Sequence, residues 1–313
     1  MNYPRTIVIA IIAVACTLTI PQASVATKQQ SRMVMLHVRV TDSTGKAVAN
    51  VPQTGIVVTE DGVPQKIEVF INDETPISYG LVIDSSASVR PQYVQVMNSA
   101  ERIVESNRPT DDTFLIRFIS SDKIEIAQEP TSDKALLIKS LRDSFYLEGG
   151  QSAVIDAVYL SANKFAQLRT DVSRPRRRVL VLITDGENRD SYYDTQALFK
   201  FLASTDVQVF TIALTKDLKP ASRDKAINLL TRLGDATGGQ TFFVSSDEEI
   251  ERIANQILNE IRTQYVIGYV PTGIDAGKDF HKIQVSLTGN PNDKRVAVTR
   301  VDYSISTDAQ TKP

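Results

Sequence analysis

The chain has 313 residues, of which 42% are hydrophobic and 23% are charged. This composition is typical of a globular protein with one large domain or two smaller ones, and it excludes disordered and collagen-like chains. Lys and Arg number 35 and Asp and Glu number 37, so the formal net charge is only -2. Because such a chain has no bulk field that attracts nucleic acid or an anionic membrane, we expect no nucleic-acid partner and local recognition of other partners.

Cysteine and histidine are scarce. The one cysteine is Cys16, in the apolar N-terminal run, and the two histidines are His37 and His281. Removal of that run would leave no thiol, which excludes disulfides, Cys-ligated zinc, iron–sulfur clusters and cysteine nucleophiles. A Ser-His-Asp triad would need one of two isolated histidines. We therefore look for chemistry carried by oxygen.

Residues 1–26 have the pattern of a secretory signal peptide. A short segment with the positive charge of Arg5 precedes an apolar run from Thr6 to Ile20, and the small residues Ser24-Val25-Ala26 favour cleavage after Ala26 by the Sec pathway. Two alternatives remain open, an uncleaved anchor and lipidation at Cys16, although the run is short for a membrane span and continues past Cys16. We expect a secreted or periplasmic bacterial protein with no stable membrane span after cleavage.

A small β segment is predicted over residues 27–75. Residues 33–41 alternate between apolar and polar side chains, which is the pattern of a half-buried strand with Val34, Leu36, Val38 and Val40 on one face. Two more strands are predicted over residues 55–59 and 65–71, joined by the turn residues Glu60-Asp61-Gly62.

From residue 76 to residue 262, short apolar strands alternate with longer helical patterns. Because strands such as Val179 to Ile183 are apolar at every position, they are predicted to be buried on both faces. This alternation predicts an α/β fold with a doubly wound, mostly parallel six-stranded sheet. The strands are predicted at 77–84, 113–119, 124–127, 178–184, 207–214 and 240–244, and the helices at 92–107, 132–143, 152–168, 195–204, 223–237 and 247–262.

Two further features of the pattern concern one edge of the sheet and the segment that follows the domain. Only residues 120–123 separate two of the strands, which is too short for a crossover, so that pair is predicted to be an antiparallel hairpin at one edge. After Arg262 the chain returns to strands at 264–270, 282–287 and 295–305. We expect this C-terminal segment, 263–306, to pack with the N-terminal one as a companion β unit, because each is too small to bury a core alone, and residues 307–313 to form a tail.

The chemistry is expected at the carboxyl ends of the strands, where ligands bind in doubly wound sheets. The first parallel strand ends in Asp84, followed by the hydroxyls of Ser86 and Ser88, and a buried strand ends at Asp185. Between them, Ser152 opens a helix after Gly149-Gly150. Two carboxylates and three hydroxyls suit a hard divalent cation, Mg²⁺ or alternatively Mn²⁺ or Ca²⁺, with an open position for a partner's carboxylate. Singly, these residues could equally be helix caps.

The residues Asp84-Ser85-Ser86-Ala87-Ser88 reproduce the Asp-x-Ser-x-Ser motif, and the chain over 76–262 resembles von Willebrand factor type A domains. The resemblance implies that Asp84, Ser86, Ser88, Ser152 and Asp185 form a metal-ion-dependent adhesion site. Ser152 stands where the family usually has Thr, four residues before Asp156, and this change keeps the hydroxyl. Asp185 corresponds to the Asp of the family's Thr-Asp-Gly stretch.

The segments on either side extend this resemblance. Glu60-Asp61-Gly62-Val63-Pro64-Gln65 before the domain and Gln264-Tyr265-Val266-Ile267-Gly268-Tyr269-Val270-Pro271 after it are similar to segments of exported bacterial von Willebrand type A-related proteins, common in Acidobacteria. The resemblance provides a site and not a ligand.

Other motifs have simpler interpretations. The basic run Arg174 to Arg178 is predicted to be a solvated loop on the side opposite the metal, and His281 a surface or half-buried strand residue. Tyr192 and Tyr193 are predicted either to form an exposed rim or to pack under their loop. Gly149-Gly150 lacks the Gly-Lys-Ser/Thr ending of a phosphate loop, which argues against nucleotide binding.

These observations predict a non-enzymatic, metal-dependent binding or adhesion module. The cation would accept an Asp or Glu carboxylate from a partner protein or surface polymer, and surrounding loops would set specificity. One alternative is an envelope assembly factor that uses the same site. Another is a metal-dependent hydrolase, which lacks a convincing general base because no histidine lies near the motif.

Overall fold

The computed structural model describes residues 33–44, 46–72, 75–168, 176–273, 278, 280–288, 294–300 and 302–304. The predicted signal peptide, residues 1–26 with Cys16, and the predicted tail, residues 307–313, lie outside the described residues. No helix in the described part is long and apolar enough to cross a bilayer.

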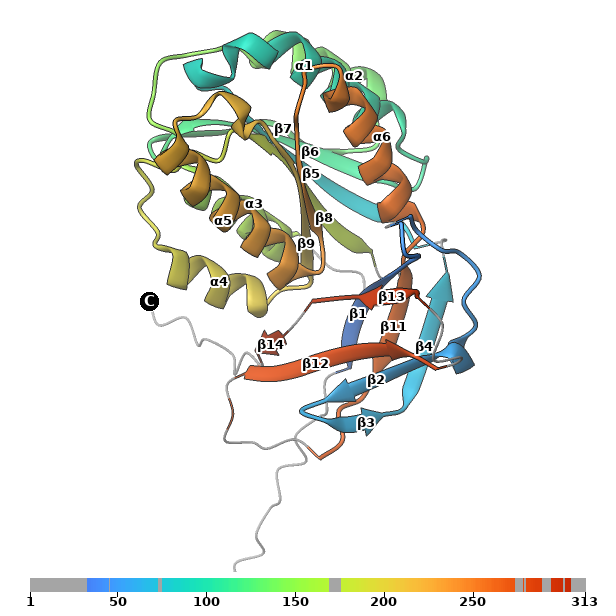
Figure 1. The fold of residues 1–313 in the computed structure, drawn as a ribbon. Coiled ribbons are helices and arrows are strands. Elements are labelled where there is room, and N and C mark those ends of the chain that lie inside the picture. Colours follow the sequence, from blue (N-terminus) through green and yellow to red (C-terminus); the bar gives the residue numbers. More distant parts are fainter. Residues whose placement is uncertain are drawn as a thin grey trace, which may run out of the picture. The chain divides into compact units, whose positions relative to one another are not determined.

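A six-stranded sheet forms the centre of the α/β domain, which comprises β5 to α6 (Figure 1). All neighbouring strands are parallel except β6 and β7, which form the predicted antiparallel edge hairpin. The predicted fold class is therefore confirmed. In spatial order the strands are β10 (Gln240–Phe243), β9 (Val207–Ala213), β8 (Arg177–Thr184), β5 (Ile77–Asp84), β6 (Asp112–Ser120) and β7 (Lys123–Thr131).

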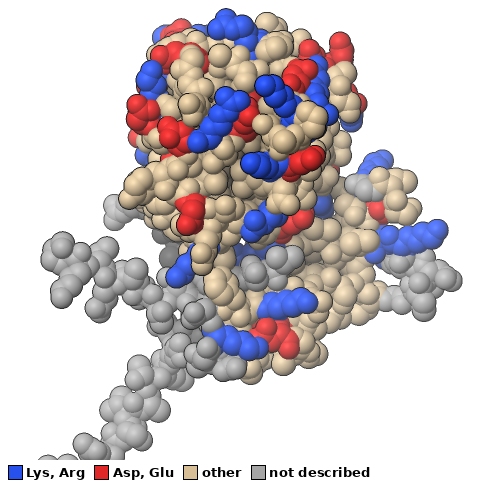
Figure 2. All heavy atoms as spheres, turned by 60° about the vertical axis from the view of Figure 1, so that its left-hand side comes forward, with Lys and Arg blue, Asp and Glu red and all other residues tan. Residues whose placement is uncertain are grey.

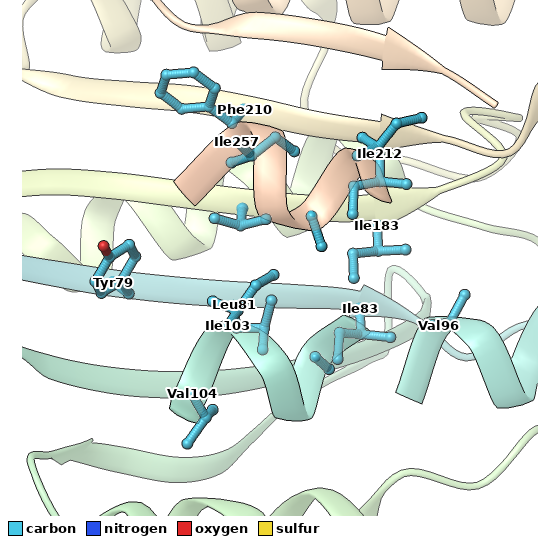
Figure 3. Packing of buried hydrophobic residues seen from close by; sticks show 14 of the residues in the cluster. Tyr79, Leu81, Ile83, Val96, Ile103, Val104, Ile183, Phe210, Ile212 and Ile257 are labelled. Atoms are coloured by element: carbon cyan, nitrogen blue, oxygen red, sulfur yellow. The ribbon is translucent and has the colours of Figure 1, made fainter. Parts of the chain in front are cut away.

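Helices cover both faces of this sheet, because its central strands are apolar on both sides. One face carries α1 (Tyr93–Glu105), α2 (Lys134–Ser144) and α6 (Glu249–Arg262), and the other carries α3 (Val154–Gln167), α4 (Thr195–Ala203) and α5 (Pro220–Thr237). Figure 3 shows the first layer, where Leu81 and Ile83 of β5 lie against Ile103 of α1. The 3₁₀ segment η2 (Ala87–Gln92) joins β5 to α1, and η3 (Thr215–Asp217) precedes α5.

The strand order reverses beside β5. The chain runs from β5 to β6 on one side and later places β8 on the other side, in parallel register with β5. The carboxyl ends of β5 and β8 therefore flank the switch point of the sheet, where ligands of such folds bind.

The remaining strands form the β unit, which the sequence predicted as one companion unit. The structure adds that it consists of two four-stranded sheets sharing one core, with Leu36, Val58 and Ile267 among its buried residues. One sheet is β13 (Val296–Val298), β1 (Val34–Thr41), β11 (Tyr265–Tyr269) and β4 (Ile67–Asn72), and the other is β14 (Asp302–Ser304), β12 (Phe280–Leu287), β2 (Ile56–Glu60) and β3 (Val63–Gln65). The 3₁₀ segment η1 (Gln53–Gly55) precedes β2.

The predicted solvated basic run is wrong for its described residues. Arg177 is only 3% exposed and donates to the Gln208 side chain at 3.1 Å and to the backbone oxygen of Ile261. Arg178 pairs with Asp206 at 2.9 Å. Arg177 is thus buried at the amino end of the sheet, where it donates to a side-chain amide and a backbone carbonyl, whereas Arg176 and Arg178 are half-buried; residues 174 and 175 lie outside the described part.

Two smaller predictions are also corrected. His281 is 1% exposed, not half-buried, because its Nδ1 atom lies 3.1 Å from Asp61 Oδ2 across the β2–β3 turn. The helix predicted to begin at Ser132 is capped by Asp133, whose carboxylate accepts from the backbone N–H of Leu136 at 3.1 Å.

Charges of both signs are interspersed over the face of the molecule shown in Figure 2, without one large patch of either sign. This distribution agrees with the small net charge and favours local recognition over a general electrostatic field.

Candidate metal centre

The structure brings all five predicted site residues together at the switch point. Asp84 ends β5, Ser86 and Ser88 follow it, Ser152 precedes α3, and Asp185 follows β8. Ser88 is exposed, whereas the exposed fractions of the other four are between 1% and 5%: Asp84 2%, Ser86 1%, Ser152 5% and Asp185 3%. The carboxylates therefore lie at the base of the site and the Ser88 hydroxyl at its mouth.

The hydroxyls contact one another and the first carboxylate. Ser86 Oγ lies 2.9 Å from Ser88 Oγ, and Ser152 Oγ lies 3.0 Å from Ser86 Oγ and 3.5 Å from Asp84 Oδ1. The hydroxyls of two different loops thus converge on one point beside Asp84. This convergence is the geometry that a shared ligand requires.

The helix-capping alternative is wrong for Ser86 and Ser88. Ser86 precedes η2, but its side chain makes no capping hydrogen bond. Helix α1 is preceded by Gln92, whose side chain makes none either. Because neither serine hydroxyl caps a helix, the hydroxyls of Ser86 and Ser88 both remain available to the site.

Backbone hydrogen bonds hold the three loops together. The N–H of Glu148 donates to the carbonyl of Ser85 at 3.0 Å, and the N–H of Arg189 donates to the carbonyl of Ser152 at 2.9 Å. The loop before α3 is thereby tied to the loops that follow β5 and β8. The relative positions of the candidate ligands are fixed by the fold and do not depend on flexible side chains.

Two glycines make these loops possible. Gly186, directly after Asp185, has φ +79°, and a Cβ there would lie 2.6 Å from Leu230 of α5. Gly150 has no room for a side chain because a Cβ would lie 2.3 Å from the Ile119 side chain. Gly150 and Gly186 therefore serve close packing around the site, whereas a Cβ at Gly149 would meet nothing within 4 Å.

The two carboxylates are held in an environment that disfavours their charge. Burial, followed by the negative charge of Asp185, raises the pKa of Asp84 from 3.8 to about 6. Burial also raises the pKa of Asp185 above its ordinary value. Asp185 Oδ2 is buried and has no hydrogen-bond partner among the described residues. A cation between the two carboxylates would remove both penalties.

The donor set determines which cation fits. It offers carboxylate and hydroxyl oxygens, which hard cations such as Mg²⁺ prefer. Among the described residues, no group of three or more His, Cys, Asp or Glu side chains is placed to hold a metal ion. A cation at this site therefore depends on hydroxyls and water to complete its coordination.

Sequence reasoning missed Thr184 as a functional residue. Its hydroxyl donates to Asp84 Oδ2 at 2.7 Å and accepts from the N–H of Gly186 at 3.0 Å. It thus orients the first carboxylate and the turn that carries Asp185. Its place directly before Asp185 in Thr184-Asp185-Gly186 was the available signal.

Asp156 has a related positioning role at the start of α3. Its two carboxylate oxygens accept from the backbone N–H groups of Tyr192 and Tyr193 at 2.7 and 2.8 Å. A second hydrogen bond joins the same two elements, because the Asn188 side chain accepts from the N–H of Ile155 at 3.0 Å. The loop after β8 and the first turn of α3 are therefore interlocked.

The two neighbouring tyrosines take different environments, so each alternative of the sequence prediction holds for one of them. Tyr192 is 86% exposed at the rim of the loop. Tyr193 stacks on Tyr159 of α3, with ring centroids 3.8 Å apart. One ring is available for contact with a partner, and the other anchors the loop.

The fold and the site together define a doubly wound α/β domain with an oxygen-only crevice at its switch point. The profile of the von Willebrand factor type A domain matches residues 80–256, which is more than half of the chain. The chain belongs to this family, whose members commonly mediate metal-dependent protein interactions. No curated protein matches the chain at a significant level.

Solved structures similar to the chain are distant. Proximal thread matrix protein 1 from the mussel byssus has 16% sequence identity and a TM-score of 0.48, with 64% of this chain and 49% of the mussel protein covered. The chain thus spans about half the length of that protein. An aerotolerance-related membrane protein from Bacteroides fragilis has 18% identity and a TM-score of 0.44, with 58% and 98% covered. The mussel protein has also been solved with a zinc-occupied MIDAS motif, at 17% identity, a TM-score of 0.49 and coverage of 64% and 49%.

Proposed function

We propose that this protein is an exported, metal-dependent protein-binding module. A divalent cation would be held by Asp84, Ser86, Ser88, Ser152 and Asp185, partly through water, and would accept an Asp or Glu carboxylate of a partner protein. The cation would supply a positive charge that orients this carboxylate. The protein residues hold and orient the cation, and the interlocked loops around it present the partner-facing surface.

The observation that carries this proposal is the buried pair Asp84 and Asp185, neither of which forms an ion pair with a cationic side chain of the described residues. Burial and the negative charge of Asp185 raise the pKa of Asp84 to about 6, and Asp185 Oδ2 has no hydrogen-bond partner within the described part of the chain. Such a pair is costly to fold, and a bound cation offsets that cost. The exposed Ser88 hydroxyl leaves the site open to a ligand from solvent.

The position of the histidines supports binding over hydrolysis. His37 lies in β1 and His281 in β12, both in the β unit, so neither is at the crevice as a general base. A cation held by two carboxylates is also a weaker Lewis acid than one held by neutral imidazoles. The local chemistry thus favours holding a partner's carboxylate.

Thermal unfolding of the metal-stripped protein tests the site. Addition of Mg²⁺ or Mn²⁺ is expected to raise the Tm, because only the folded state offers the assembled ligands. Asp84→Ala should abolish this increase, whereas the matched control Asp235→Ala, at an exposed carboxylate on α5, should keep it. An unchanged wild-type Tm would contradict the proposed site.

Recovery of partners from envelope extracts tests the function. We expect immobilised protein to retain specific proteins in Mg²⁺ and to release them in EDTA. The Asp84→Ala protein should retain none of these. If the same proteins are recovered with Mg²⁺ and with EDTA, binding through the metal is wrong.

A further inference from the structure

A cleft of about 570 Å³ begins at Gly186, the residue directly after Asp185. Clefts of about 300–1,000 Å³ accommodate ligands of small-molecule or short-peptide size. One wall is the loop of residues 186–189, and the other is α5 from Ser222 to Arg232. The cleft and the candidate metal centre therefore share the loop after β8, and a chain bound at one can continue into the other.

The floor and the rim of the cleft differ in chemistry. Ile155 and Ala226 are buried and Leu229 is half-buried, so the floor is apolar. Lys225 and Arg232 are exposed residues of α5 that line the same cleft. The cleft can thus bury an apolar side chain while its rim faces a charged one.

The cleft is lined by three cationic side chains, Arg189, Lys225 and Arg232, and by two acidic ones, Glu187 and the exposed Asp224, so its charged lining carries a net charge of +1 (3 − 2). Glu187 accepts from Ser222 Oγ at 2.9 Å and forms an ion pair with Arg189, so the negative charge of Glu187 is compensated by Arg189. Among the described residues, neither Lys225 nor Arg232 forms an ion pair. The guanidinium of Arg232 lies over the Phe199 ring at 4.4 Å, which holds it in place.

Charge balance indicates which ligand fits. A divalent cation is neutralised by the carboxylates Asp84 and Asp185, so a carboxylate from a partner adds one uncompensated negative charge. Arg189 lies close enough for the charge of Asp185 to contribute to raising the pKa of its guanidinium, after the larger effect of Glu187. Because Arg189 is balanced by Glu187, the rim charge open to a ligand is that of Lys225 and Arg232, which exceeds the single charge of Asp224 by one.

We propose that this cleft binds the part of the partner next to its metal-bound residue, and that this part is an extended acidic peptide segment. The segment places an apolar side chain on the floor formed by Ile155, Ala226 and Leu229, and a second carboxylate at Lys225 and Arg232. This inference rests on the proposed function, because the first carboxylate binds the metal. The inference adds a second determinant of specificity, the cleft, by which the protein distinguishes one acidic segment from another.

Short labelled peptides measure this selection by fluorescence anisotropy with the full protein in Mg²⁺. The single-acid peptide carries one Asp among Gly and Ser residues. Each peptide of the double-acid series also carries one Leu and one Glu. The distance of the Glu from the Asp, on its N-terminal or C-terminal side, differs from one peptide of the series to the next. Neutral peptides with Gln in place of Glu are the reference. We expect one spacing to bind about three- to fivefold more tightly than its Gln reference, as for a partly exposed charge pair, and this ratio to fall with added salt.

Charge reversal assigns the preference to the cleft. The double variant Lys225→Glu with Arg232→Glu should lose it, while binding of the single-acid peptide stays metal-dependent. A peptide with Lys in place of the second Glu should then bind this variant more tightly than the wild type. The matched control Lys66→Glu, at an exposed lysine of the β unit, should keep the wild-type ratio.

The outcomes separate the inference from the function on which it rests. If the single-acid peptide binds in Mg²⁺ but not in EDTA, and no second acid improves binding, the cleft proposal is overturned and the metal-dependent function stands. If Arg90→Glu, on the η2 side of the metal centre, removes the preference and the cleft variant does not, the cleft proposal is also overturned. If no peptide binds in a metal-dependent manner, both proposals are wrong.

Discussion

A buried aspartate lies at each end of β5, Asp111 from the chain before β6 and Asp84 from β5 itself, and the two have opposite environments. At the amino end, Asp111 accepts from the N–H groups of Ile77 and Arg108 at 2.9 and 2.7 Å and pairs with Arg262. Burial alone would raise the pKa of Asp111, but these donors hold it below its ordinary value. At the carboxyl end, Asp84 faces Asp185, and its pKa is raised to about 6.

The difference separates a carboxylate with a structural role, Asp111, from one for which we propose a bound cation, Asp84. Asp111 is stabilised by the chain itself, because every strong donor it needs is supplied by residues of the fold. Asp84 receives two hydroxyl contacts and a backbone N–H, but no cationic side chain. The proposed cation site rests on this pair of uncompensated carboxylates at the switch point.

Substitution of Asp111 and substitution of Asp84 should change the free energy of unfolding differently, and this is the largest effect that we expect. In EDTA at neutral pH, Asp111→Ala should lower the free energy of unfolding by about 3–5 kcal/mol, because it removes the carboxylate that pairs with Arg262 and accepts from the N–H groups of Ile77 and Arg108. Asp84→Ala should leave it unchanged or raise it, since the repulsion with Asp185 is lost. Urea denaturation measures both. Equal losses for the two variants would contradict the comparison.

The pH dependence of the free energy of unfolding should reveal the raised pKa of Asp84. The pKa of Asp84 is about 6 in the folded chain and near 3.8 when unfolded, so the folded state binds its proton more tightly. Its contribution to stability is therefore present below about pH 4 and lost as the pH rises to about 6. Two pKa units correspond to about 3 kcal/mol. Denaturation in EDTA from pH 4 to pH 7 should show this loss, and Asp84→Asn should remove it.

Metal binding should reverse this slope, because the cation requires both carboxylates to be ionised. With excess Mg²⁺, the increase in Tm should be larger at pH 7.5 than at pH 5. An increase of the same size at both values would indicate that Mg²⁺ binds elsewhere.

Loss of the Thr184 hydroxyl should weaken the metal centre without removing a ligand. Thr184→Val leaves Asp84 Oδ2 without its donor, and the loss of such a supporting contact lowers metal affinity by about 10- to 100-fold. Calorimetric titration with Mn²⁺ measures the change. The matched control is Thr211→Val, since the buried hydroxyl of Thr211 in β9 has no hydrogen-bond partner among the described residues. The control should bind Mn²⁺ as the wild type does.

The smallest expected effect distinguishes the two rim tyrosines. Tyr193→Ala should lower the free energy of unfolding by about 1 kcal/mol beyond the loss of buried area, because its ring stacks on Tyr159. Tyr192→Ala should change stability by less than about 0.5 kcal/mol, as is usual for an exposed side chain. Thermal unfolding compares them. A larger loss for Tyr192 than for Tyr193 would contradict the assignment.

The order of strands and helices and the five candidate ligands could be predicted from the sequence, because both follow local rules. Continuous apolar strands such as β8 show that the sheet is covered on both faces, and Asp84 and Asp185 are found by their places after strands. Their proximity could be expected because β5 and β8 are parallel neighbours and the strand order reverses beside β5. Whether these five residues bind a metal stays a prediction.

The sequence could not predict what depends on long-range packing. Arg177 is buried because Gln208 and the end of α6, at Ile261, surround it, although its neighbours made the run resemble a solvated loop. Asp156 contacts Tyr192 and Tyr193 across 36 and 37 residues of sequence. No local pattern indicates which polar groups a helix start will meet.

The attachment of the two carboxylates to adjacent strands has a mechanical consequence. Asp84 ends β5 and Asp185 follows β8, and the two strands pair in parallel from Ile77 with Arg177 to Ile83 with Ile183. A pull on a partner held at this point would load both strands at the same end. Neither is an edge strand, so tension is shared by two ladders within the sheet rather than peeling a strand from its margin.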